Sequence, residues 1–543
     1  MNSIKPKGII FYDYQPFSKG KYKHDTSKIA IKKLCFIKNL KLTSPREYSC
    51  WDTSNSPVAL NRLFKLCKSF KTNFKIPHKL FTPLKKAPLN RISLYLPHYS
   101  NFLFLKKHGV KYPLKHLTLQ YPNQTSKLAA VFKILRGHPD LTQFKLRFPE
   151  GSYAVKEQEL TSFSKGVNKL KKLQTLNIDT HYFTSKTNII RSFFKSMAMW
   201  NLTFLHITLE LGQLEFENIA IGISLLAGVK SLRGLEMEWN FPHIGNREEQ
   251  SFKELVKAFQ IFIKNQWKLN YLLFHYRTHP DIAIPTEIFK GIEKMKFLET
   301  LSLSPSCGNW SEKDVDAFIS SLGGHSKLKK LELILYEFPK NNVEQFYKKL
   351  EAGLQGVKKI NQLKITGPKI PGLTLEKAVG LKDVFENLRK LEFCVQLQQN
   401  STTDATSFAK LLSSCTQLND LMLGINQTIV LNETALNHIL TAIGGLEKLV
   451  SVELFLGRVK REGNKHIFSS FFENLEKIWS FRVKFIELFL SEEDIISLGN
   501  NLIQKKQLRS VIVAGAFPSI SKDVKDWFVS TLRNQGIKTP PLM

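Results

Sequence analysis

A short apolar pattern, L-x-x-L-x-L, recurs along most of the chain at a nearly constant interval. Fifteen copies align, from Leu89/Ile92/Leu94 to Leu508/Val511/Val513, with Ile, Val, Met or Phe sometimes replacing leucine. Their first residues run from 89 to 508, so fourteen intervals cover 419 residues, a mean of about 30. A repeat of this length predicts stacked supersecondary units in which each repeat buries its apolar residues only against its neighbours.

The pattern predicts a strand followed by a helix in each repeat. Its alternating core suits a short strand with one buried face. Between copies, Ser311 is a candidate N-cap, acids follow in the first helical turn, and Gly323-Gly324 is a stop signal. The segment that starts at Ser491 repeats this entry. Successive strands joined by helices must run parallel.

These repeats resemble the leucine-rich repeat family, and within it the long-repeat, ribonuclease-inhibitor-like subclass. The resemblance covers residues 89 to about 515. It departs from the family pattern because the Asn or Cys expected after the last strand leucine is mostly missing. The resemblance implies an α/β leucine-rich-repeat solenoid of about 15 repeats, with parallel strands on the concave face and helices on the convex face.

The two ends of the chain differ from the array. Residues 1–88 carry 19 Lys/Arg and 4 Asp/Glu, a net charge of +15, and we interpret them as a basic leader with an aberrant first repeat or N-terminal cap. In that segment, Ile31/Leu34/Phe36 imitates a repeat strand. Residues 516–543 are expected to hold a capping helix, from Ser521 to Asn534, and a tail. The longest interval carries an insertion at 241–250.

No motif for catalysis, for a cofactor or for a metal emerges. The chain contains no phosphate-binding glycine loop, no H-E-x-x-H and no G-x-S-x-G. Its six cysteines lie far apart and no secretory signal precedes them, so we expect reduced thiols in an intracellular and most simply cytoplasmic protein, with the nucleus or an organelle left open. No apolar run is long enough to span a membrane. We therefore expect a non-enzymatic protein without cofactor.

The outward strand positions predict what the surface binds. The fifteen outward triplets, such as Arg91/Ser93/Tyr95, hold 8 Lys/Arg and 7 Asp/Glu, so most of the +33 charge must lie on the leader, the helices and the turns before strands. A nearly neutral face with scattered aromatics suits a protein ligand better than a phosphate backbone. The alternative is that the aromatics only stack across strands to stabilise the sheet. The partner-binding candidates are Tyr95, Phe204, His206, Glu236, Glu238, Tyr271, His275 and Phe455.

Two functions remain in competition. The first is a protein–protein interaction scaffold that binds an unidentified protein through the concave face. The alternative is a basic structural subunit of a ribonucleoprotein or other polyanion-containing assembly, which would bind nucleic acid through the N-terminal segment. The polyanion-binding candidates are Lys19, Lys21, Lys23, Lys32 and Lys33.

Overall fold

The chain forms two compact units in a computed structural model. The first unit contains residues 1–241 and 245–266, and the second contains residues 242–244 and 267–543. The structure describes residues 39–42, 69–72, 89–95, 112–120, 135–147, 161, 165–166, 169–179, 191, 194–195, 197–198, 201–210, 216–241, 249–278, 286–306, 311–335, 343–357, 359–366, 382–395, 402–425, 430–460, 468, 471–472, 475–487, 490–515, 520–540 and 542.

The first unit is a run of parallel strands in chain order, each paired with the next. These strands are β1 (Asn39–Leu42), β2 (Ser69–Thr72), β3 (Arg91–Tyr95), β4 (His116–Gln120), β5 (Gln143–Arg147), β6 (Thr175–Asp179), β7 (Phe204–Glu210) and β8 (Gly234–Phe241). Two helices of this unit, α8 (Phe216–Leu226) and α9 (Glu249–Asn265), pack against each other.

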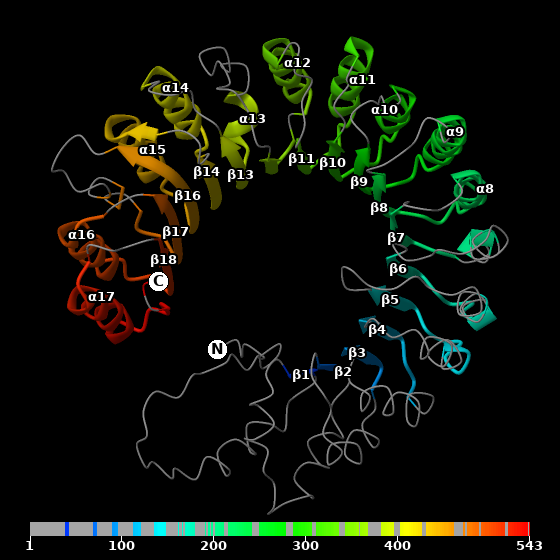
Figure 1. Ribbon diagram of the computed structural model, residues 1–543, viewed down its shortest axis with the longest axis horizontal. Coiled ribbons are helices and arrows are strands. Elements are labelled where there is room, and N and C mark those ends of the chain that lie inside the picture. The colour runs from blue at the N-terminus through cyan, green and yellow to red at the C-terminus, as the bar shows by residue number, and fades with distance from the viewer. Residues whose placement is uncertain are drawn as a thin grey trace, which may run out of the picture. The chain divides into compact units, whose positions relative to one another are not determined.

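The second unit repeats the same plan with a helix between most strands. Its strands, all parallel, are β9 (Tyr271–Thr278), β10 (Thr300–Ser306), β11 (Lys330–Ile334), β12 (Gln362–Thr366), β13 (Lys390–Val395), β14 (Asp420–Ile425), β15 (Val430–Asn432), β16 (Ser451–Lys460), β17 (Ser480–Glu487) and β18 (Ser510–Ala514). Its helices are α10 (Thr286–Glu293), α11 (Glu312–Gly323), α12 (Val343–Gln355), α13 (Lys382–Glu386), α14 (Thr402–Ser413), α15 (Glu433–Gly444), α16 (Glu492–Ile503) and α17 (Lys522–Asn534). Within this unit the strands line the inner side of a curve and the helices its outer side (Figure 1).

The predicted α/β solenoid and its strand register are confirmed. Each of the fifteen expected strands begins at the first residue of its predicted outward triplet. The second and fourth residues of the strands form the core, and Leu301, Leu331 and Leu363, which are neighbours in register, are at most 1% exposed. Two further strands, β1 and β2, extend the parallel pairing upstream of residue 89, whereas the strand-like Ile31/Leu34/Phe36 falls outside the described residues.

The helix boundaries follow the capping signals. Ser311 caps α11, with a capping box in which its hydroxyl accepts from the Asp314 amide while the Asp314 carboxylate accepts from the Ser311 amide. Ser491 makes the same box with Asp494 at α16. The capping helix expected near residue 521 is α17, capped by Ser521. The long interval after β8 is occupied in part by α9, which at 17 residues is longer than the other described helices.

A hydrogen-bond ladder of backbone groups joins the turns that precede the strands. In the described repeats, the residue before a strand accepts two N–H donors from the next repeat, as the Glu299 carbonyl does from Lys329 and Lys330 at 2.9 and 3.0 Å. The carbonyls of Asn361 and Trp479 do the same. We name this feature the turn ladder. Because the turn ladder uses main-chain groups, it does not depend on the identity of the exposed side chains in these turns.

None of the described helices is long and apolar enough to cross a membrane.

Candidate functional site

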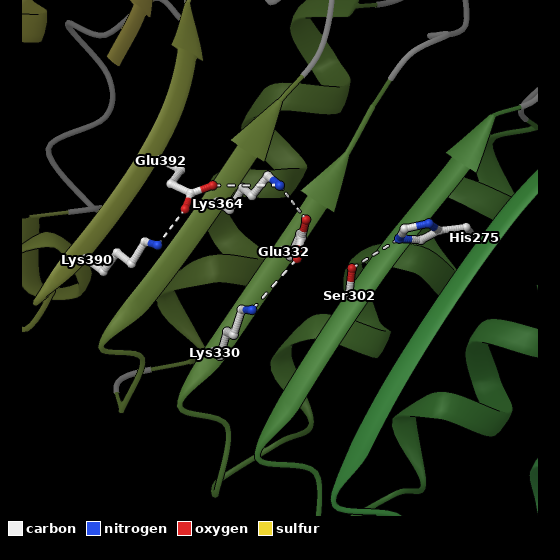
Figure 2. A network of polar contacts seen from close by, with 7 residues as sticks. All are labelled: His275, Ser302, Lys330, Glu332, Lys364, Lys390 and Glu392. Carbon is white, nitrogen blue, oxygen red and sulfur yellow. Dashed lines mark hydrogen bonds and ion pairs between the residues drawn. The ribbon is translucent and has the colours of Figure 1, made fainter. Parts of the chain in front are cut away.

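Five charged side chains form a network on the strand face of the second unit (Figure 2). Register places Glu332 of β11 beside Lys364 of β12, and Lys364 beside Glu392 of β13. Lys364 Nζ lies 2.7 Å from Glu332 Oε1 and 3.7 Å from Glu392 Oε2. Lys390 lies 2.7 Å from Glu392, and Lys330 lies 4.0 Å from Glu332. We name these five residues the strand-face network.

The network is only partly covered by protein. The carboxylates of Glu332 and Glu392 are 14% and 20% exposed, whereas Lys330 and Lys390 are 43% and 44% exposed. Burial alone would raise the pKa of Glu392, but its hydrogen bond to Lys390 and the charges of Lys390, Lys364 and Lys330 hold that pKa below its ordinary value. Burial would likewise lower the pKa of Lys364, yet Glu332 and Glu392 raise it. The ionised forms therefore support one another, and the side chains are fixed before anything binds.

The network surrounds a shallow depression rather than a pocket. Its cavity volume is about 90 Å³, and the apolar floor is formed by Leu331 and Leu363. Pockets for small organic ligands usually have a volume of roughly 300–1,000 Å³. The geometry therefore offers a contact surface to a larger partner.

Opposite charges also meet further along the same face. Arg482 of β17 donates to Glu453 of β16 at 2.9 Å. Asp420 of β14 lies next to Lys390 in register. With Asp420 included, the three lysines of the network face three carboxylates, so this part of the face is neutral.

In the first unit, the side chains of the predicted candidates His206 and Glu236 lie within hydrogen-bonding distance of each other. His206 Nδ1 lies 2.5 Å from Glu236 Oε2, and Thr208 Oγ1 lies 3.2 Å from His206 Nε2. The acid–histidine–hydroxyl order is that of a nucleophile with its base, but Thr208 is only 3% exposed, so its hydroxyl is closed to a substrate. Next to His206 in register is Asn177, which is 7% exposed and whose Oδ1 has no hydrogen-bond donor among the described residues.

The aromatic candidates lie on different strands. Phe204 of β7 covers Gly234 of β8, where an added Cβ would lie 2.4 Å from the phenyl ring. Tyr271 and Phe455 are partly exposed on β9 and β16. Tyr95 ends β3, and Glu238 is partly exposed on β8.

Of the aromatic and histidine candidates, Phe204 and His206 belong to the first unit, and Tyr271 and His275 belong to the second. In the second unit, His275 Nε2 lies 3.2 Å from Ser302 Oγ (Figure 2). Lys19, Lys21, Lys23, Lys32 and Lys33 lie outside the described residues.

Some outward positions are more covered than the alternation predicts. Asn177, Thr208, Ser302 and Ser304 are all at most 7% exposed. Each is small, and larger side chains such as His206 and His275 lie on the neighbouring strands. Small outward residues on a curved sheet are thus screened by larger neighbours.

Sequence reasoning named none of the strand-face network as binding candidates. The signal was present, because stacking the predicted triplets in register puts Glu332, Lys364 and Glu392 side by side. In the described part of the chain, no group of three or more His, Cys, Asp or Glu residues could hold a metal ion.

No model of a known protein family matches the chain, and a search of curated proteins finds no match.

Proposed function

We propose that this chain is a non-enzymatic scaffold that binds a protein partner through its strand face. The observation that carries the proposal is the strand-face network, in which lysines and glutamates are paired, half-covered and fixed in alternating order on adjacent strands. Surfaces that bind proteins use such mixed charge patterns for orientation and specificity. A face that held a phosphate backbone would instead carry an excess of lysine and arginine.

The scaffold also fits the leucine-rich repeat family, and within it the ribonuclease-inhibitor-like subclass. What supports this assignment is the agreement between the L-x-x-L-x-L motif and the start of fifteen strands.

Site-specific photo-crosslinking tests the proposed surface. A photoreactive residue is placed at Gln362, which is exposed on β12 inside the network, and in a second protein at Lys313, which is exposed on α11 of the same unit. We expect a protein adduct from position 362 in native lysate that survives nuclease and high salt, and none from position 313. The adduct should decrease severalfold when Lys364→Gln is added, but not when Lys410→Gln is added on α14. Adducts from both positions alike, or from position 313 alone, would contradict a strand-face scaffold.

A polyanion-binding role for the N-terminal segment is the second candidate. One observation favours it: Lys41 of β1 lies opposite Lys71 of β2 in register, within the segment of net charge +15. A segment with this excess of positive charge attracts polyanions such as nucleic acid.

Replacing Lys19, Lys21, Lys23, Lys32 and Lys33 by Gln tests this candidate in the full chain. If these lysines contact single-stranded RNA, the slope of log affinity against log salt should decrease by about 3 to 4. An unchanged slope would show that the segment serves some other purpose.

A further inference from the structure

An exposed aromatic pair lies on the turns that precede β9 and β10, outside the strand face. Trp267 and Phe297 are 50% and 42% exposed, although both are large apolar side chains. Their ring centroids are 5.9 Å apart and the ring planes meet at 49°. A single exposed apolar residue needs no explanation, but two that contact each other form a surface to which a partner can bind.

Lysines surround this pair. Lys268 Nζ lies 4.9 Å from the centroid of Trp267, and Lys327 Nζ lies 4.5 Å from the centroid of Phe297. Lys296 precedes Phe297 and makes only long contacts, of 3.4 and 3.5 Å, to backbone carbonyls. We name these five residues the aromatic–lysine rim.

The rim carries uncompensated positive charge. The three turns 267–270, 296–299 and 326–329 hold four lysines and one glutamate, a net charge of +3. The single acid, Glu299, is engaged by Lys329 at 2.8 Å. Among the described residues, no carboxylate forms an ion pair with Lys268, Lys296 or Lys327, although the charge of Lys327 helps Lys329 to lower the pKa of Glu299. This contrasts with the strand-face network, where every lysine has an acidic partner.

The backbone beneath the rim is held firmly. The Asn270 carbonyl accepts from the amides of Glu299 and Thr300, and the Glu299 carbonyl accepts from Lys329 and Lys330, as part of the turn ladder. Leu269, Leu298 and Leu328 anchor the same turns in the core with no exposed surface. The backbones of neighbouring turns therefore follow one another at about one strand spacing, about 4.8 Å, and hold the two rings in contact.

We propose that the aromatic–lysine rim binds single-stranded nucleic acid, with bases stacking on Trp267 and Phe297 and phosphates contacting Lys268, Lys296 and Lys327. Exposed rings interleaved with cations are the combination that binds single strands, because every base has a face to stack and every nucleotide has a phosphate. A cation–π contact at an exposed site is weak, so a base replaces the ammonium on the ring while the ammonium moves to a phosphate.

Other occupants fit the rim less well. The bases of a duplex already stack on one another, so they expose no face that could stack on the two rings. An acidic protein segment would engage the lysines but would leave the ring faces unused. A membrane surface favours a broad apolar patch, whereas here a single pair of rings is flanked by three cations. The rim uses no residue of the strand-face network or of the N-terminal segment, so it stands independently of both proposed functions.

Fluorescence anisotropy with the full chain tests the rim. The probes are labelled oligouridine and oligodeoxythymidine of 20 nucleotides, at about 50 and 200 mM salt, with polyglutamate and vesicles of phosphatidylcholine and phosphatidylserine as comparison ligands. The protein carries Gln at the five leader lysines, which removes their contribution. We expect Trp267→Ala/Phe297→Ala to weaken oligonucleotide binding at least about 30-fold, which corresponds to the loss of two stacked bases.

The matched control is Trp479→Ala, because Trp479 is 54% exposed on a turn of the same unit and has no ring partner among the described residues. It should leave affinity unchanged. Lys268→Gln/Lys296→Gln/Lys327→Gln should reduce the salt slope by about 2. Ultraviolet crosslinking should join the oligonucleotide to peptides containing Trp267 or Phe297.

Several outcomes would overturn the proposal. The first is that the leader-substituted chain does not bind the oligonucleotides. The second is that the rim variant and the Trp479 variant lose the same affinity. The third is that polyglutamate or the vesicles bind as tightly as the oligonucleotides. A lysine variant that loses affinity while the aromatic variant keeps it would refute base stacking.

Discussion

Replacement of Leu331 by Ala measures how strongly one repeat depends on its neighbours. Leu331 is fully buried at the centre of β11, between Leu301 of β10 and Leu363 of β12. The change removes three carbon atoms, worth about 2.4 kcal/mol of transfer free energy at about 0.8 kcal/mol for each buried carbon group. Both neighbours are held in register, so the cavity cannot close and its own cost brings the total to about 3–5 kcal/mol.

Hydrogen exchange followed by mass spectrometry is the suitable assay, because a long solenoid need not unfold in a single step. If the substitution lowers the free energy of local opening by about 3 kcal/mol, the amides of β10, β11 and β12 that exchange through local opening should exchange more than 100-fold faster. Amides of β4 to β6, in the other unit, should be unaffected. Ile496→Ala is the control, since Ile496 is 37% exposed on α16 and its truncation should change little. Unchanged exchange in all three strands would refute the assignment of Leu331 to a closely packed core.

Three further predictions concern a cap, a carboxylate and a thiol. Ser311→Ala removes the hydroxyl of the α11 capping box, which should cost about 1 kcal/mol and speed amide exchange in the first turn about fivefold, whereas Ser320→Ala on the exposed side of the same helix should not. The Lys-supported pKa of Glu392 lies below its ordinary value of 4.5, so its contribution to stability is present above pH 4.5 and is lost as the pH falls through the lowered value. Glu392→Gln should therefore flatten the decrease of the urea midpoint between pH 6 and 3, and a parallel curve for the variant would count against the network. Burial raises the pKa of the free Cys415 thiol to about 12, so iodoacetamide at pH 8 should label it only after denaturation, as peptide mass spectrometry would reveal.

The repeat length and the strand register were predictable because both depend on which apolar side chains are buried. The alternation in segments such as Thr300–Leu303 is visible in one sequence, and the structure starts β10 where that alternation begins. The strand β1 escaped prediction because two competing motifs lie there, Ile31/Leu34/Phe36 and Ile37/Leu40/Leu42, and the structure places its strand on the second. The strand β2 escaped prediction because its apolar positions are irregular. In β2 the motif is Cys67/Phe70/Thr72, which contains no leucine.

The binding surfaces were harder to predict because they depend on which side chains become neighbours. The pairing of Lys364 with Glu332 and Glu392 follows from parallel register, which one repeat alone does not reveal. Trp267 and Phe297 lie 30 residues apart in sequence, in turns that the strand pattern does not cover. Contacts between residues of different repeats become visible only when the repeats are aligned in their structural register.

The last repeat of the second unit has a consequence for association between molecules. Residue Lys538 lies alongside β18 as a single parallel bridge, accepting from the Val511 amide and donating to the Arg509 carbonyl at 2.9 Å each. It thus occupies backbone groups that a further strand would use. An open edge of parallel strands can template end-to-end growth into fibres. By filling that edge with one residue, the chain hinders a strand row of this length from extending into a polymer.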